Sequence, residues 1–132
     1  DSYIRPRRKR SGLPNEAENY YREGFDFDEL LLDLETLKSQ SNRASSHDKQ
    51  IIIVEGVFLL KSDLKSNWDT SVWLEIPENE IVERGSHRDA EFFGSEQKAR
   101  EIYLDRIIPA QRIHRQLDKP ENNATVTYPF AQ

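Results

Sequence analysis

The aliphatic run over residues 51–54 (Ile-Ile-Ile-Val) constrains the fold of this chain more than any other segment. Four consecutive aliphatic side chains suit a strand that is buried on both faces, as in a parallel sheet covered by helices. We therefore predict a core strand over residues 50–55, with Glu55 and then Gly56 at its carboxyl end. Ligands bind at that end in open α/β sheets, and an ionised carboxylate there is unfavourable unless it meets a cation, a donor or water. Glu55 is thus either a metal ligand or a solvated acid at the tip of the strand.

The composition narrows the class of protein. The chain has 132 residues, which fit one domain, and its 36% apolar content argues against disorder although 33% of the residues are charged. The net charge of -5 argues against a general nucleic-acid-binding protein. The absence of cysteine excludes disulfides and thiolate metal sites. No apolar run has the length of a membrane span or signal peptide, so we expect a cytoplasmic protein without a membrane partner; a homo-oligomer stays open.

Helical periodicity predicts an amphipathic helix over residues 25–37, with Asp26 as its N-cap. Its apolar face is expected to pack in the core and consists of Phe27, Leu30, Leu31, Leu34 and Leu37. Residues 1–24 are rich in charge, proline and glycine, which predicts a long loop, and residues 38–49 predict a polar, serine-rich connection. The basic cluster in residues 5–10 is either a solvated part of that loop or a surface that faces phosphates.

Two further strands are predicted in the second half of the chain. Residues 69–77 form the first, which Pro77 ends, and residues 124–128 form the second. Because strands alternate with helices along the sequence, the order predicts an α/β fold with a parallel sheet.

Two helices are predicted between these strands. Residues 78–92 are helical by composition, and a longer helix covers residues 96–116. Ser95 is expected to cap the longer helix, and Pro109 is expected to kink it.

Arginines on these two helices form a candidate phosphate clamp. Arg84 and Arg88 are four residues apart and so share one helix face. Together with Arg100 and Arg106 they could hold a polyphosphate through bidentate contacts. The alternative is a set of surface ion pairs, such as Glu80 with Arg84.

Taken together, several segments resemble motifs of the uridine kinase family of P-loop nucleoside kinases, and the wording is closest to a bacterial, uridine kinase-like subgroup. The resemblance covers most of the chain in the family's order. It lies in Asp1-Ser-Tyr-Ile-Arg-Pro6, residues 21–34, Ile53-Val-Glu-Gly-Val-Phe-Leu-Leu60, residues 69–74, Arg84-Gly-Ser-His-Arg-Asp89, and residues 103–109 followed by 118–126.

The resemblance implies a single domain with a three-layer P-loop NTPase-type parallel sheet and flanking helices, incomplete at its N-terminus. Its expected parts are a substrate-side loop and helix, the core strands, a lid with the long helix, and a final strand and tail. These correspond to residues 1–49, 50–77, 78–118 and 119–132.

The implied reaction is transfer of the γ-phosphoryl group of ATP to the 5′-hydroxyl of a nucleoside, with Mg²⁺ as cofactor. Asp1 would accept the hydroxyl proton, and Glu55 would belong to the Mg²⁺ shell. Arg84 and Arg88 would close over the phosphates and stabilise the charge of a loose transition state.

The remaining site residues also follow from the resemblance. Arg100 is expected to join the two lid arginines at the ATP phosphates. The nucleoside is expected to contact Tyr3, Arg5 and Tyr103.

Three departures from the family pattern affect this prediction. The phosphate loop Gly-x-x-x-x-Gly-Lys-Ser/Thr is not in these 132 residues, so the chain is expected to begin downstream of it and to be inactive as it stands. Phe93-Gly-Ser95 stands in place of the lid element Arg-Gly-Arg. Residues 38–49 replace a histidine-containing hairpin, and Ile102 replaces a glutamine, so the substrate is open.

Three alternatives follow. The first is a related P-loop kinase for nicotinamide riboside or pantothenate. The second is a non-catalytic module that kept the kinase fold. The third is a nucleic-acid-binding module that uses the basic cluster of residues 5–10, for which binding should depend strongly on salt.

Overall fold

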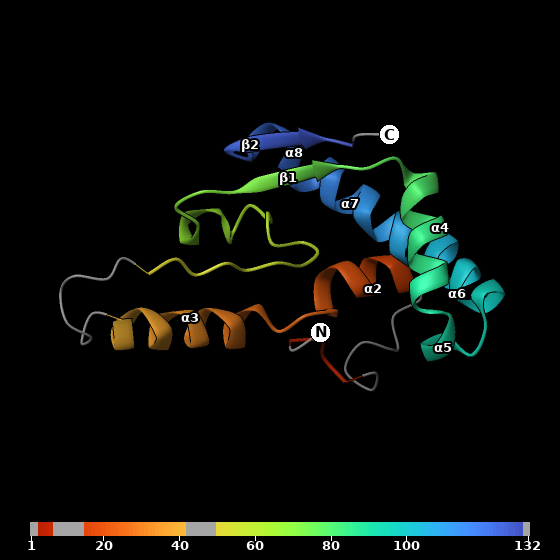
Figure 1. Ribbon diagram of the computed structural model, residues 1–132, viewed down its shortest axis with the longest axis horizontal. Coiled ribbons are helices and arrows are strands. Elements are labelled where there is room, and N and C mark those ends of the chain that lie inside the picture. Colours follow the sequence, from red (N-terminus) through yellow and green to blue (C-terminus); the bar gives the residue numbers. More distant parts are fainter. Residues whose placement is uncertain (1–2, 7–14, 42–49, 131–132) are drawn as a thin grey trace.

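The computed structural model describes residues 3–6, 15–41 and 50–130, and it is a mixed helix and strand structure (Figure 1). Its two strands, β1 (Val72–Glu75) and β2 (Val126–Pro129), pair in parallel, with Val72 opposite Val126 and Leu74 opposite Tyr128. The helices are α2 (Glu16–Glu23), α3 (Phe27–Ser41), α4 (Glu78–Arg88), α5 (Ala90–Phe93), α6 (Glu96–Ile102), α7 (Ile108–Asp118) and α8 (Pro120–Asn123). A 3-10 turn, η1 (Lys65–Asn67), precedes β1, and a π-helical turn, η2 (Tyr103–Ile107), joins α6 to α7. These elements confirm an α/β fold at the level of class.

The predicted helix over residues 25–37 is α3. The side chain of Asp26 accepts a hydrogen bond from the backbone N–H of Glu29 at 3.2 Å, as its predicted role as N-cap requires. Leu30 and Leu34 are buried, whereas Leu37 is 48% exposed. The predicted core face is therefore confirmed over the first half of the helix, and the second half runs beside residues 50–54, away from the other helices (Figure 1).

The predicted loop over residues 1–24 is wrong for its last third, which forms α2. Asn15 caps this helix by accepting a hydrogen bond from the N–H of Glu18 at 3.2 Å. Ala17 and Tyr21 are buried on its inner face. Burial of that face stabilises a helix that is short by itself.

The helices after β1 lie where they were predicted, except that the first of them is divided into two. The helix predicted over residues 78–92 ends at Arg88, and α5 begins at Ala90, because the chain leaves helical geometry at Asp89 (φ -97°, ψ 9°). Gly94 then adopts a left-handed conformation (φ 91°), which ends α5. Ser95 caps α6 as predicted, and accepts from the N–H of Lys98 at 3.2 Å.

The predicted kink near Pro109 takes the form of the π-helical turn η2. Pro109 has no N–H and cannot donate to the carbonyl of the residue four positions earlier. A π turn immediately before it absorbs this defect while the helix continues as α7.

The prediction of a buried core strand over residues 50–55 is wrong for this structure. Residues 51–56 are extended but belong to no strand ladder, and the side chains of Ile51 and Ile53 are 87% and 86% exposed. A strand buried on both faces needs paired edges and covering layers. In the described part of the chain β1 has one neighbour, β2, and no strand lies between β1 and residues 51–56.

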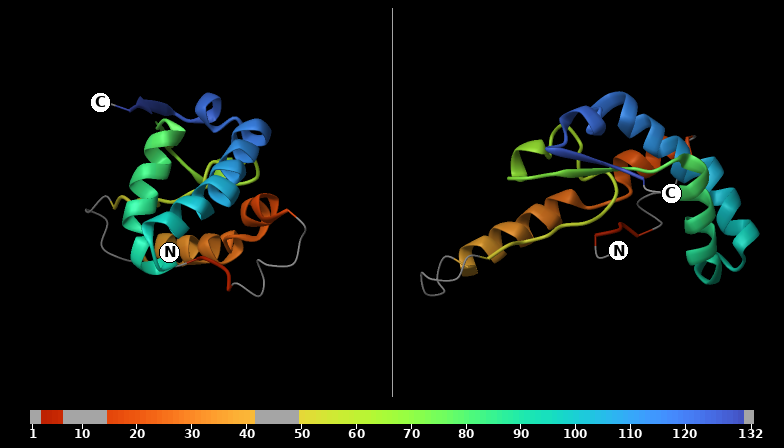
Figure 2. Two further views of the ribbon diagram at one scale, coloured as in Figure 1. Left: turned by 90° about the vertical axis from the view of Figure 1, so that its right-hand side faces the viewer. Right: turned by 45° about the horizontal axis from the view of Figure 1, so that its top comes forward.

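Two apolar clusters form the core. One joins α2 to α7 through Ala17, Tyr21, Phe58 and Ala110. The other joins α4 to the η2 and α7 region through Val82, Tyr103, Ile107 and Ile108. The side chain of Tyr20 packs against both clusters, so the two clusters share one core. The helices that carry them, α2, α4 and α7, lie close together in Figure 2.

Candidate functional site

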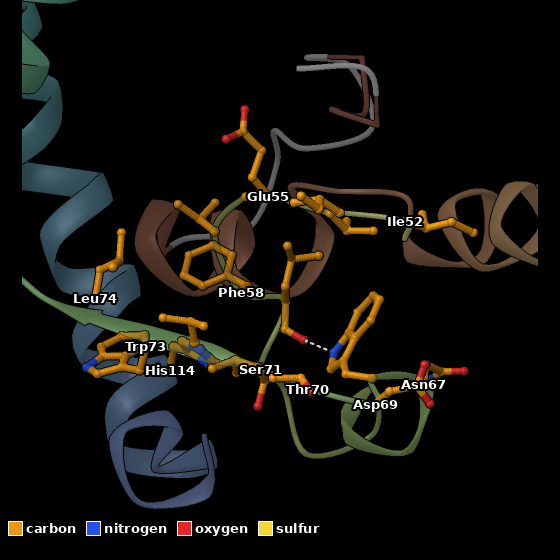
Figure 3. Close-up of a pocket in the computed structure, with 18 of the residues that line it drawn as sticks. Ile52, Glu55, Phe58, Asn67, Asp69, Thr70, Ser71, Trp73, Leu74 and His114 are labelled. Atoms are coloured by element: carbon orange, nitrogen blue, oxygen red, sulfur yellow. Dashed lines mark hydrogen bonds between the residues drawn. The ribbon is translucent and has the colours of Figure 1, made fainter. Parts of the chain in front are cut away.

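A large cavity lies between residues 50–60 and β1 (Figure 3). Its volume is about 1340 Å³, and most of its lining is aliphatic or aromatic. The indole N–H of Trp68 donates to the carbonyl oxygen of Leu59 at 2.7 Å across one part of this space. Trp73 and His114 lie at another side of it, where α7 covers the sheet (Figure 3). We call this space the large cavity.

A smaller cavity of about 220 Å³ adjoins the same extended segment from the side of α3. Tyr3, Asp33 and Glu55 all contribute to its lining. The hydroxyl of Tyr3 donates to the Asp33 carboxylate at 2.8 Å, and this hydrogen bond, with burial second, raises the pKa of Tyr3 above its ordinary value. Tyr3, a predicted nucleoside contact, and Glu55, the predicted metal ligand, thus lie at one cavity.

Glu55 is exposed where the extended segment ends and the chain turns. Gly56 follows it with φ 156°, a backbone conformation that residues other than glycine rarely adopt. The Glu55 side chain points away from Trp73 and His114 (Figure 3), and it makes no hydrogen bond or ion pair with another residue that the structure describes. Mg²⁺ in phosphoryl-transfer sites is commonly held by one or two carboxylates plus substrate phosphates and water, so an unpaired exposed carboxylate fits that ion.

A metal site made of protein ligands alone would need several ligand side chains close together. Within residues 3–6, 15–41 and 50–130 there is no group of three or more His, Cys, Asp or Glu side chains that could hold a metal ion. Any ion at Glu55 would therefore need further ligands from outside the described residues, such as substrate or water oxygens.

The side chain of Arg88 is held by hydrogen bonds to two neighbouring residues, Asp89 and Tyr103. Its guanidinium donates to both carboxylate oxygens of Asp89, at 2.7 and 3.1 Å, and to the hydroxyl of Tyr103 at 3.1 Å. The Tyr103 hydroxyl donates in turn to Asp89 at 2.8 Å. The hydrogen bond from Arg88 lowers the pKa of Asp89, and burial together with Asp89 raises the pKa of Tyr103 to about 12. The predicted lid arginine Arg88 and the predicted substrate residue Tyr103 are therefore in direct contact.

The other two lid arginines are more accessible. The side chain of Arg84 is 65% exposed, lies 3.4 Å from Glu80 and covers the ring of Phe130 at 4.8 Å. The spacing of Glu80 and Arg84 thus gives the surface ion pair that the sequence left as an alternative. Arg100 is exposed on α6 and pairs with no carboxylate in the part of the chain that the structure covers.

Arg5 is committed to acidic partners beside α2 and α3. Its guanidinium contacts Glu23 at 2.6 Å and Asp26 at 3.4 Å. Its backbone N–H donates to Gly24, and Ile4 forms an isolated antiparallel bridge with Phe25. Arg5 fastens the first described segment to the start of α3.

Asp1, the predicted base, lies outside the described residues, as do residues 7–10 of the basic cluster. Among the described site residues the structure forms two groups. Tyr3 and Glu55 share the smaller cavity, and Arg88 and Tyr103 share hydrogen bonds. No contact between described residues joins these two groups.

A buried polar network is the part of this region that the sequence did not predict. The Asp118 carboxylate accepts from the hydroxyl of Tyr21 at 2.5 Å, and from the N–H and hydroxyl of Ser62 at 2.8 and 2.9 Å. Nδ1 of His114 lies 2.8 Å from it, and the ring of His114 forms part of the large cavity's lining. Lys61 donates to the carbonyl of Tyr21 at 2.7 Å. The network fixes the turn after the extended segment against α2 and α7.

Burial and hydrogen bonding oppose each other in this network. Burial by itself raises the pKa of Asp118, but the hydrogen bonds from Tyr21, Ser62 and His114 together lower it below its ordinary value. Burial lowers the pKa of His114 more than the neighbouring carboxylate raises it. His114 and Asp118 are four residues apart on one helix, and this spacing is the sequence signal that could have indicated their contact.

The described part of the chain contains no helix that combines the length and the apolar character needed to cross a membrane. Comparisons with models of protein families, with curated proteins and with solved structures found no match for this chain.

Proposed function

We propose that this chain is the part of a uridine kinase-like phosphotransferase that follows the phosphate loop. In this proposal it transfers the γ-phosphoryl group of ATP to the 5′-hydroxyl of a nucleoside, on a three-layer P-loop-type fold and with Mg²⁺. The observation that carries the proposal is the shared cavity of Tyr3 and Glu55. These residues are 52 positions apart, and they come from the two motifs to which the resemblance assigns the substrate and the metal.

The proposed roles follow from charge and exposure. Glu55, exposed and unpaired among the described residues, would contribute one oxygen to the Mg²⁺ shell. Asp1, two residues before Tyr3, would accept the proton of the attacking hydroxyl. Electrostatic stabilisation of the transferring group would come from arginine side chains.

The helical pair α4 and α6 would supply those arginines. Arg84 and Arg100 are exposed and could reach phosphates without breaking a strong contact. Arg88 would first have to exchange Asp89 for a phosphate oxygen, because Asp89 now holds it through two hydrogen bonds. In this proposal the arginines therefore take up their positions at the phosphates only when the substrate binds.

The test is Mg²⁺-dependent transfer from ATP, measured across a panel of nucleosides with the natural polypeptide that includes the phosphate loop. Glu55→Gln should lower kcat/KM by roughly 100-fold and raise the Mg²⁺ concentration needed for half-maximal rate. Glu35→Gln is the matched control, because Glu35 is exposed on α3 and lines neither cavity. Its rate should stay within about twofold of the parent.

Other results would redirect the assignment. Transfer to nicotinamide riboside or pantothenate but to no nucleoside would favour a related small-molecule kinase. ATP binding without transfer to any hydroxyl would favour a non-catalytic module. A polypeptide with no phosphate loop, or equal rates for Glu55→Gln and the parent, would exclude the proposed mechanism.

A further inference from the structure

Arg88, Asp89 and Tyr103 form a closed set of hydrogen bonds at the end of α4. The Nε–H group of Arg88 donates to Oδ1 of Asp89 at 2.7 Å, and its Nη2 group donates to Oδ2 of the same carboxylate at 3.1 Å. Nη2 also donates to the hydroxyl of Tyr103 at 3.1 Å, and that hydroxyl donates to Oδ2 of Asp89 at 2.8 Å. We call these three residues the latch.

The latch occupies the part of the guanidinium that a phosphate needs. An arginine offers an oxyanion two faces, and each face presents a pair of N–H groups. One face pairs Nε with Nη2, and the other pairs Nη1 with Nη2. Because Nη2 donates to both Asp89 and Tyr103, neither face of Arg88 is complete. Arg88 can therefore give a phosphate single hydrogen bonds from Nη1 but no bidentate contact.

Solvent reaches the arginine of the latch but not the tyrosine. The side chain of Arg88 is 75% exposed and that of Asp89 is 24% exposed, whereas Tyr103 is 5% exposed. The ring of Tyr103 fills the space beside Gly85, where a Cβ atom would collide with it. An anion can therefore reach Arg88 from solvent, while the packing at Gly85 holds the Tyr103 hydroxyl in place.

The other two arginines predicted to contact phosphates are not held in this way. Arg84 lies 3.4 Å from one carboxylate, that of Glu80, and its side chain is 65% exposed. Arg100 is exposed on α6 and pairs with no carboxylate in the described part of the chain. Exposed single contacts of the Arg84 kind are weak. Within this group, Arg88 is thus the arginine whose availability depends on a neighbouring acid.

We propose that Asp89 is an autoinhibitory positioning residue, which together with Tyr103 withholds Arg88 from a polyphosphate until the polyphosphate replaces the Asp89 carboxylate. The exchange is chemically matched, since phosphate and carboxylate oxygens both accept paired N–H groups of arginine. The inference rests on the proposed function for the identity of the anion, the phosphates of ATP. It adds a contact that opposes their binding, and it assigns the Tyr103 hydroxyl to this contact and not to the nucleoside.

The test measures the affinity of the chain for inorganic tripolyphosphate by titration calorimetry. Asp89→Asn should raise this affinity about three- to tenfold, because it frees Nε and Nη2 of Arg88. Glu91→Gln is the matched control, since Glu91 is exposed on α5 and forms no ion pair with Arg88 in the described chain. It removes the same charge and should change the affinity less than about twofold at about 0.15 M salt, which screens exposed charges.

A double-substitution cycle separates the latch from general charge effects. In an Arg88→Gln background, Asp89→Asn and Glu91→Gln should have equal effects, within about twofold, because no guanidinium is left to release. Tyr103→Phe keeps the buried ring and removes the hydroxyl, so it should raise the affinity about twofold. A gain from Asp89→Asn that persists without Arg88, or equal gains from Asp89→Asn and Glu91→Gln in the parent, would overturn the proposal.

The Nε–H resonance of Arg88 provides a readout that needs no variant. It should shift as tripolyphosphate is added, because its acceptor changes from a carboxylate to a phosphate oxygen. The Nε–H resonance of Arg22, which pairs with Glu18 at 2.9 Å on α2, should stay unchanged. An unchanged Arg88 resonance, or no binding of tripolyphosphate to either the parent or the Asp89→Asn chain, would contradict the latch.

Transfer assays distinguish a failure of the latch from a failure of the proposed function. In the natural polypeptide with its phosphate loop, Asp89→Asn should lower the KM for ATP about three- to tenfold and change kcat less than about twofold. Transfer with equal KM in Asp89→Asn and Glu91→Gln would exclude the latch and leave the function standing. Tighter tripolyphosphate binding by Asp89→Asn without transfer to any hydroxyl would support the latch and exclude the function.

Discussion

At the scale of single residues, Asp118 shows how one buried carboxylate can join distant parts of the sequence. It is 6% exposed and accepts hydrogen bonds from α2 and from the turn after the extended segment. The donors Tyr21 and Ser62 are 97 and 56 positions away. The large cavity keeps its shape on this side because Asp118 fixes both segments to α7.

Asp118→Ala should lower the free energy of unfolding by about 3 kcal/mol, because it leaves several buried donors without an acceptor. Chemical denaturation of the 132-residue chain measures this loss. Asp105→Ala is the matched control, since Asp105 is exposed on η2, and it should cost less than about 0.5 kcal/mol. Similar losses in the two variants would contradict the importance of the network.

Several site residues could be predicted from the sequence, but the residues that they contact could not. Tyr3 and Glu55 were both selected from motifs, and the structure places both at one cavity. The pairing of Arg88 with Asp89 and Tyr103 was not foreseen, because a motif names residue types and not the partners that occupy them. Asp1 lies outside the described residues, so its role stays a prediction.

At the scale of elements, α4 packs closely against η2 through a glycine. A methyl group at Gly85 would collide with the ring of Tyr103, in a part of the interface that lies in the core. In an open helix position the change from glycine to alanine stabilises by about 1 kcal/mol. Here steric overlap reverses that sign.

Gly85→Ala should therefore destabilise the protein by about 1–3 kcal/mol through overpacking. Asn79→Ala, at an exposed position of the same helix, should be neutral or slightly stabilising. Urea denaturation distinguishes the two. A Gly85→Ala variant as stable as the parent would mean that α4 and η2 are free to move apart.

Elements were predictable where the signal is local. The cap at Asp26 and the periodic leucines suffice for α3. Helix α2 was not predicted, although Asn15 and Glu18 have the spacing of a capping signal, because the prolines and glycines on both sides of it favour a loop. The segment over residues 51–54 was mistaken for a buried strand because burial on two faces depends on distant partners, which periodicity cannot reveal.

At the scale of the whole molecule, stability should decrease as the pH falls from 7.5 to 5. Burial lowers the pKa of His114 below its ordinary value of 6.5. Below that value the unfolded chain therefore binds a proton before the folded chain does, and protonation favours unfolding. The loss begins near pH 6.5 and continues until the pH passes the folded pKa, with a slope of at most about 1.4 kcal/mol per pH unit.

Urea denaturation across this range measures the slope. His114→Phe, which keeps a buried ring without a titrating group, should flatten it. His87→Asn should leave the slope unchanged, because the His87 side chain is 84% exposed. A slope that persists in His114→Phe would assign the pH dependence to other groups.

The placement of the two tryptophans has an optical consequence. The chain contains no tryptophan other than Trp68 and Trp73, and both belong to the lining of the large cavity. Their indoles are partly open to solvent in this structure. The ultraviolet emission of the protein therefore originates almost entirely at this one place, and its wavelength reports, without any label, how far the cavity is open to water.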